Sequence, residues 1–146
     1  MAVVTFTNNF KNIIDQLREI LRTEFKGALP TYVGSESVQA SAQFVRLDPV
    51  GSELVDFMTT SETREFTINI YYYFLDKNIK KTSLDHVLRY VSRIEALIHD
   101  NLIMTLTDSS KVLNARITST TLDTLEDENE YVVEMVWQGQ HTGNIS

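Results

Sequence analysis

The histidines are the side chains best suited to bind a metal or to transfer a proton near neutral pH. The chain has three, His86, His99 and His141, and they form neither an HExxH motif nor a pair at i and i+4. No cysteine is present to complete a zinc site, so metal catalysis is not expected. His86 and His99 fall in the first and last turns of a predicted helix, where a structural role is favoured.

Motifs for a nucleophile or a phosphate-binding loop are also missing. The glycine–serine pairs at 34–35 and 51–52 lack the G-x-S-x-G context of a serine nucleophile. The five glycines form no G-x-G-x-x-G or G-x-x-x-x-G-K-[ST] pattern, so no phosphate cradle is predicted. Glu62 and Glu65 are interpreted as solvated strand residues rather than an acid–base pair. The sequence therefore predicts no catalytic, cofactor-binding or metal-binding residues.

The chain is acidic, with 13 Lys and Arg against 20 Asp and Glu and a formal net charge of −7. This balance disfavours nonspecific binding to nucleic-acid phosphates and to anionic membranes. No apolar run approaches the roughly 20 residues that span a bilayer, and no basic segment precedes an apolar one at the N-terminus. We expect a soluble chain with no membrane partner.

Acidic residues concentrate at 123–130, a polar segment between two strand-like stretches, and we predict an acidic hairpin loop there. Two interpretations stay open: a solvated tip that aids solubility, or an acidic rim that repels DNA phosphates or docks a basic partner. The spacing lacks the alternating ligands and central glycine of a Ca²⁺ loop. The acidic residues of the predicted loop are Asp123, Glu126, Asp127, Glu128 and Glu130.

Two helices and one long strand are the clearest elements available to position these side chains. Apolar residues at helical spacing predict a helix over 8–25 and a second from about 83 to 99. Strict alternation of apolar and polar residues over 64–75 predicts a strand with one core-facing side.

Shorter patterns predict the remaining strands. A strand over 38–48 is expected to end at the proline that follows it, because proline cannot donate to a ladder. Residues 50–62 could form a short strand or a loop. Strands at 112–122 and 131–138 are expected to form a hairpin, followed by a short C-terminal tail at 139–146.

The element order αβ(β)βαββ predicts an α+β fold: a two-layer domain with a mostly antiparallel sheet and two helices packed on one face. No internal repeat or linker divides the chain, so one domain spanning 1–146 is expected.

The sheet face opposite the helices is predicted to be partly apolar, because tyrosines and valines point away from the core on the 64–75 strand and on the last strand. Either the two helices divide between the faces, or the N-terminal segment or 50–62 folds across, or further copies of the chain cover this face. A basic turn nearby could meet the acidic loop of a neighbouring copy. The predicted interface residues are Tyr71, Tyr73, Val132, Val136, Lys77, Lys80 and Lys81.

The chain as a whole resembles the tail-terminator, or tail-completion, family of tailed bacteriophages. The resemblance rests on the order of elements, which is shared in part by neck and head-completion proteins. Its components are the helix at 8–25, Arg-Glu-Phe-Thr-Ile-Asn-Ile-Tyr-Tyr-Tyr-Phe at 64–74, the helix at 83–99, and a hairpin ending Glu-Tyr-Val-Val-Glu-Met-Val-Trp at 130–137.

The resemblance implies a non-catalytic virion protein of the tail or neck, assembled in the host cytoplasm and carrying no cofactor. It implies a hexameric ring that caps the tail tube, contacts the tube protein and the head–tail connector or neck proteins, and lets DNA pass through its lumen without specific binding. The alternatives are a neck or head-completion protein, and a small-molecule-binding α+β domain or unrecognised enzyme that uses the aromatic residues Tyr71, Tyr73 and Trp137.

Overall fold

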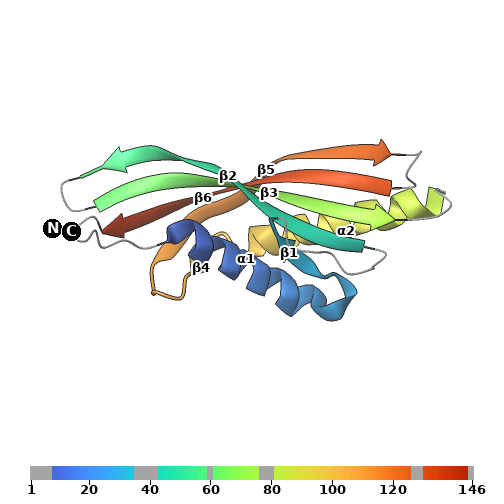
Figure 1. Ribbon diagram of the computed structural model, residues 1–146, viewed down its shortest axis with the longest axis horizontal. Coiled ribbons are helices and arrows are strands. Elements are labelled where there is room, and N and C mark those ends of the chain that lie inside the picture. Colours follow the sequence, from blue (N-terminus) through green and yellow to red (C-terminus); the bar gives the residue numbers. More distant parts are fainter. Residues whose placement is uncertain (1–7, 35–42, 59–60, 76–80, 126–129, 145–146) are drawn as a thin grey trace.

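The computed structural model describes residues 8–34, 43–58, 61–75, 81–125 and 130–144 (Figure 1). Within these ranges the chain forms two α-helices, one 3-10 turn and six strands. In chain order they are α1 Asn9–Phe25, η1 Lys26–Ala28, β1 Thr31–Val33, β2 Gln43–Phe57, β3 Ser61–Leu75, α2 Lys81–Asp100, β4 Met104–Thr105, β5 Lys111–Leu125 and β6 Glu130–Asn144.

The helices form where the apolar periodicity predicts them. The side chain of Asn8 caps α1 by accepting a hydrogen bond of 3.1 Å from the backbone N–H of Lys11, which satisfies one of the unpaired donors of the first turn. Each helix then buries one stripe of residues three and four apart. These are Ile13, Ile14, Leu17, Leu21 and Phe25 on α1, and Val87, Val91, Ile94 and Ile98 on α2.

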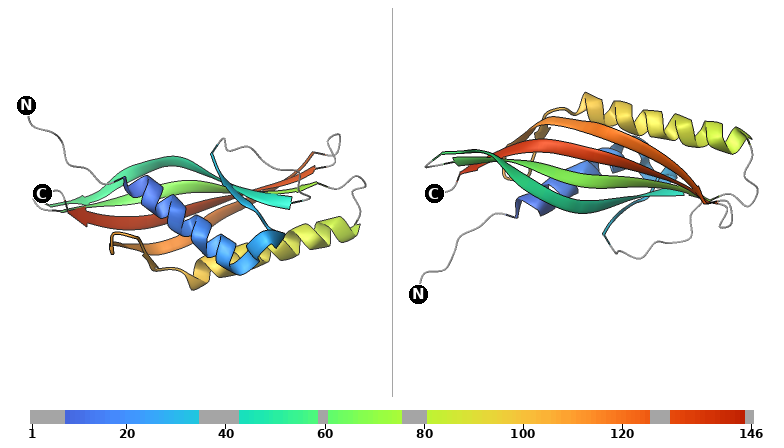
Figure 2. Two further views of the ribbon diagram at one scale, coloured as in Figure 1. Left: turned by 60° about the horizontal axis from the view of Figure 1, so that its bottom comes forward. Right: turned by 90° about the horizontal axis from the view of Figure 1, so that it is seen from above.

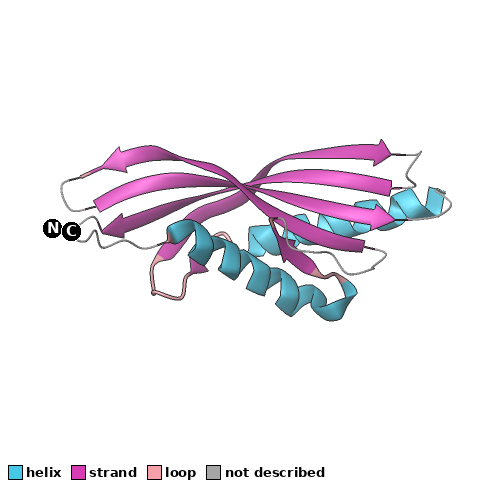
Figure 3. Ribbon diagram, viewed as in Figure 1, coloured by secondary structure: helices cyan, strands magenta, loops and turns pink. Residues whose placement is uncertain are grey.

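The six strands form one sheet in the order β1-β2-β3-β6-β5-β4 (Figure 3). Only β1 and β2 run parallel to each other, and every other neighbouring pair is antiparallel. Three long antiparallel pairings, β2 with β3, β3 with β6 and β6 with β5, make up most of the sheet. The predicted α+β fold with a mostly antiparallel sheet is confirmed.

Both helices lie against the same side of the sheet (Figure 2). One cluster of buried side chains joins them to the sheet: helix residues such as Leu17 and Ile94 share it with Ile70 of β3 and Trp137 of β6. The alternative in which the helices divide between the two faces is therefore wrong. Residues 50–57 do not fold across the free face either, because they belong to β2.

Strand β2 continues through Pro49, where the sequence predicted its end. Strand β1 pairs only with Val45, Arg46 and Leu47, so no described strand lies on the outer edge of β2 at Pro49 and no ladder N–H is needed there. A register shift between Pro49 and Gly51 absorbs the irregularity. The open question about 50–62 is thus answered: the described part of this segment is the end of β2 and the start of β3.

Three further expectations need correction. The predicted tail at 139–146 is strand β6 as far as Asn144. The predicted loop at 123–130 is shorter, because β5 runs to Leu125 and β6 begins at Glu130. The short strands β1 and β4 were not predicted at all. Some predicted site residues lie outside the described residues: Lys77, Lys80, Glu126, Asp127 and Glu128.

Candidate assembly surface

One face of the sheet carries neither helix, and we call it the open face (Figure 2). Its side chains alternate with the buried ones, so each cross-strand rung places four of them in a row. From β2 through β3 and β6 to β5, the five rungs are Phe44, Tyr73, Val132 and Asp123; Arg46, Tyr71, Glu134 and Thr121; Asp48, Asn69, Val136 and Ser119; Gly51, Thr67, Gln138 and Arg116; Glu53, Glu65, Gln140 and Leu113.

The first rungs form an aromatic end of the open face. The rings of Phe44 and Tyr73 stack with centroids 4.6 Å apart, and Tyr71 lies 6.3 Å from Tyr73. Tyr32 meets Phe44 edge-on at 5.9 Å. Burial raises the pKa of the Tyr73 phenol above its ordinary value, so the ring stays neutral. The structure thus brings four predicted interface residues to one face, where each is half-buried: Tyr71, Tyr73, Val132 and Val136. Their role as an interface stays a prediction.

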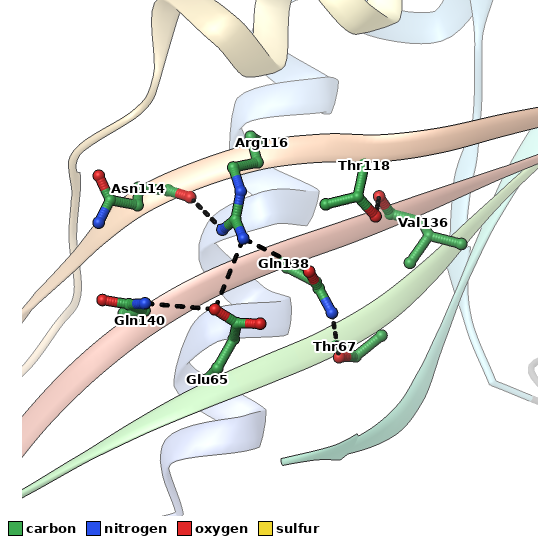
Figure 4. Close-up of polar contacts among 8 residues, drawn as sticks. All are labelled: Glu65, Thr67, Asn114, Arg116, Thr118, Val136, Gln138 and Gln140. Atoms are coloured by element: carbon green, nitrogen blue, oxygen red, sulfur yellow. Dashed lines mark hydrogen bonds and ion pairs between the residues drawn. The ribbon is translucent and has the colours of Figure 1, made fainter. Parts of the chain in front are cut away.

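The other end of the open face is a polar network (Figure 4). The Arg116 guanidinium reaches across β6 and lies 3.5 Å from the Glu65 carboxylate and 3.5 Å from Oε1 of Gln138. Gln140 donates to the same carboxylate at 3.2 Å, and Gln138 donates to the Thr67 hydroxyl at 3.3 Å. Five polar side chains of this end thus find partners within the sheet, so the open face is less apolar than the sequence pattern indicated.

The open face is acidic as well as polar. Across the five rungs it carries two arginines and five carboxylates, a net charge of 2 − 5 = −3. The arginines are Arg46 and Arg116, and the carboxylates are Asp48, Glu53, Glu65, Asp123 and Glu134. Asp123, one of these carboxylates, belongs to the predicted acidic loop, and Glu130, a second member of that loop, is the first residue of β6. Such a surface repels a phosphate backbone.

A group of exposed apolar side chains lies on the β2–β3 hairpin, which extends beyond the helices (Figure 1), a feature that the sequence analysis missed. They are Val50, Leu54, Val55, Phe57 and Met58, each between 50% and 62% exposed, and we call them the apolar arm. The pattern held one signal: Leu54 with Val55, and Phe57 with Met58, are adjacent apolar pairs in a strand that ought to alternate. A register shift between Leu54 and Asp56 interrupts the alternation.

Three residues that could suggest a serine nucleophile meet at the β4–β5 turn. Nε2 of His141 lies 2.9 Å from Oγ of Ser110, which donates to Asp108 Oδ1 at 2.5 Å. The serine proton is therefore directed at the carboxylate, and the serine oxygen accepts from the imidazole. In a nucleophilic triad the serine hydroxyl donates to the imidazole instead, and the carboxylate accepts from the other ring nitrogen of the histidine. We interpret these three residues as a hydrogen-bond network that stabilises the turn.

The remaining histidines also occupy structural positions. Nε2 of His86 lies 3.0 Å from Oε1 of Gln43, which accepts a hydrogen bond of 2.7 Å from the buried hydroxyl of Tyr72. Nε2 of Gln43 in turn donates to the carbonyl of Ala28 at 2.8 Å, tying β2 to the end of the first helical segment. His99 is exposed in the last turn of α2. In the described ranges, no three His, Cys, Asp or Glu side chains gather in a group able to hold a metal ion.

Trp137 cannot contribute to an aromatic binding surface with Tyr71 and Tyr73, as one alternative supposed. Its indole is fully buried on the helix side of the sheet, whereas the two tyrosines lie on the open face. Neither described helix is long and apolar enough to cross a membrane.

Comparison with known proteins gives the fold but no family. No protein-family model matches the chain, and no curated protein matches it. A chain in the solved virion of a native gene transfer agent particle is similar, with 14% identity and a TM-score of 0.54 over 91% of this chain and 93% of that one. A second solved chain without a functional description is 15% identical, with a TM-score of 0.58 over 95% and 97%. Both likenesses cover nearly the whole length of each chain, and they show a shared fold.

Proposed function

We propose that this chain is a non-catalytic structural subunit of a phage or phage-like virion, and that it forms the ring that terminates the tail tube. The observation that carries the proposal is the sheet itself, which leaves one long face without a helix and an apolar arm exposed beyond the helices. A subunit that assembles with copies of itself accounts for both features.

Two observations support the virion context. The whole-length fold is shared with a chain of a gene transfer agent virion particle. The order of elements also resembles the tail-terminator family. That family would place the chain in the tail or neck, between the tube protein and the connector.

The open face suits the lumen of such a ring. Its net charge of 2 − 5 = −3 over five rungs would repel DNA phosphates, so DNA would pass without specific binding. The aromatic end would then lie against the neighbouring subunit, where Tyr71, Tyr73, Val132 and Val136 could be buried further. A neck or head-completion protein is the second candidate, because a ring at either position needs the same open sheet.

Electron microscopy of purified tail tubes mixed with the protein tests the proposal. A terminator binds one end of each tube and stops its growth. Binding to isolated connectors but not to tube ends would favour the neck assignment instead. Absence of binding to both would contradict a role at this junction.

A further inference from the structure

The apolar arm holds five of the eleven large apolar side chains that are exposed on the described surface. Phe57 and Met58 are each 62% exposed. Their backbone is held in the hairpin, because Met58 N donates a hydrogen bond of 2.8 Å to Ser61 O. A strand on the surface of a monomer normally exposes its polar side and buries its apolar side. Here apolar residues are exposed on both sides of the arm, which is the pattern of a segment inserted into a partner.

A second apolar surface lies at the far edge of the sheet. Leu102, Ile103 and Leu113 are 48%, 61% and 46% exposed, and we call them the edge patch. Two contacts hold these residues together: Ala115 N donates to the carbonyl of Leu102 at 3.0 Å, and β4 pairs with the start of β5. The patch therefore has a fixed shape and does not depend on a partner for its order.

The arm and the edge patch lie at the same level along the strands. Leu54 is opposite Arg64, Arg64 is opposite His141, His141 is opposite Val112, and Val112 is opposite Met104, the neighbour of Ile103. One rung thus runs from the arm on β2 to the patch beside β4. Repeating the subunit along this rung direction brings the arm of one copy to the patch of the next.

Backbone groups at the edge of β2 favour the same contact. Strand β1 covers β2 only at residues 45–47, and β4 covers β5 only at Lys111 and Val112. The described part of β2 beyond residue 47 therefore has no further strand beside it, whereas on β5 the backbone of Leu102 continues the cover of β4 as far as Ala115. Open edges of this kind are templates for pairing with another chain.

Charge argues for a head-to-tail contact rather than a twofold one. The arm carries exposed Glu53 and Asp56, and the one nearby cation, Arg64 opposite Leu54, is paired with Glu62, so two arms brought together would repel each other. The segment around the edge patch carries exposed Lys111, Asp100 and Asp108, a net charge of 1 − 2 = −1. A head-to-tail contact therefore brings less negative charge together than a contact between two arms.

We propose that the apolar arm of one copy docks on the edge patch of the next copy, and that this head-to-tail contact closes the ring. The inference rests on the proposed function for its closed geometry, since a heterologous contact gives either rings or open filaments.

Cysteine cross-linking tests this contact, because the natural chain contains no cysteine. The double variant Phe57→Cys, Ile103→Cys should give a ladder of covalent multimers on a non-reducing gel after mild oxidation. Each single variant should give no ladder. A matched control pairs Phe57→Cys with Leu88→Cys, since Leu88 is 46% exposed but lies on α2, away from the patch. That pair should stay monomeric on the gel.

The outcomes separate this inference from the proposed function. If light scattering shows a multimer and the double variant gives no ladder, the docking inference is wrong and the ring proposal stands. A covalent dimer from Phe57→Cys alone would overturn it in favour of arm-to-arm contact. Cross-linking of Phe57→Cys to the tail-tube protein by a thiol-to-amine reagent, with no ladder of this chain, would place the arm on a different virion protein and would also overturn it. A wild-type chain that is monomeric throughout overturns both proposals.

Discussion

The indole of Trp137 occupies the space beside Gly139, two residues further along the same side of β6. A Cβ added at Gly139 would lie 2.6 Å from Cη2 of Trp137 and 2.6 Å from Cγ1 of Val112. Trp137 and Val112 are both fully buried, so neither can move aside into solvent. A glycine in the middle of a strand is therefore required here by close packing.

Gly139→Ala should destabilise the fold by about 1–3 kcal/mol, because the added methyl overpacks the core. Urea unfolding followed by tryptophan fluorescence measures the loss. Gly51→Ala is the matched control: a Cβ there meets nothing within 4 Å, so its unfolding midpoint should stay near that of the wild type. Equal losses in the two variants would contradict the packing argument.

The buried polar group of Gln43 should contribute measurably to stability. Tyr72→Phe removes the 2.7 Å hydrogen bond to Oε1 of Gln43 and leaves the ring packing intact. We expect a loss of about 0.5–1.5 kcal/mol in the free energy of unfolding, the usual net value of such a bond. Tyr71→Phe removes a half-buried hydroxyl of the open face that accepts a hydrogen bond from the Asn69 amide, and it should cost less. A larger loss from Tyr71→Phe would contradict the assignment.

Acidification should weaken the fold through His141. Burial lowers the pKa of this imidazole, and the nearby Asp108 carboxylate only partly offsets the effect. The unfolded chain then binds this proton more tightly than the folded chain, so the stabilisation is complete above a pH of about 6.5 and decreases as the pH falls toward the lowered pKa.

Urea midpoints at pH 7 and pH 5 measure this effect. His141→Gln keeps a donor for Ser110 and removes the titrating group, so the difference between the two midpoints should shrink. His99→Gln, a change at an exposed histidine, should leave the difference as it is in the wild type. An unchanged difference in His141→Gln would assign the acid sensitivity to other groups.

The acidic loop should affect assembly through charge. Replacing Glu126, Asp127 and Glu128 by Gln, Asn and Gln should change the salt dependence of oligomer formation if the loop faces a charged partner. The control variant neutralises three exposed acids on the helices, away from the edge patch: Glu19, Glu24 and Asp85. The control carries the same change in net charge at different positions. Identical salt profiles for the two variants would show that the loop only aids solubility.

Periodicity predicted the parts of the fold that dominate the core. The helices and the strand around Ile70 have apolar residues at regular spacing, and each was predicted within a few residues of its observed bounds. The strands β1 and β4 were missed because segments of three and two residues carry too little pattern. Pro49 was interpreted as the sign of a strand end, although an open edge accommodates it. The last strand was predicted to end at residue 138, although it continues through Gly139, which the neighbouring indole requires.

Only the part of the candidate site that follows from alternation within a strand was predicted. Alternation along β3 and β6 correctly placed Tyr71, Tyr73, Val132 and Val136 on one face. The apolar arm was not predicted, because its exposure depends on the hairpin extending beyond the helices. The polar network around Glu65 was missed as well, since it joins residues of β3, β5 and β6 that only the register brings together.

The mass of the protein in solution tests the central claim most directly. Multi-angle light scattering at micromolar concentration should give one species several times the chain mass of 16.7 kDa. Its mass should fall when Phe57→Glu places a charge on the arm, and should stay unchanged for Leu88→Glu on α2. A wild-type mass of 16.7 kDa at every concentration would contradict the claim that the chain assembles with copies of itself.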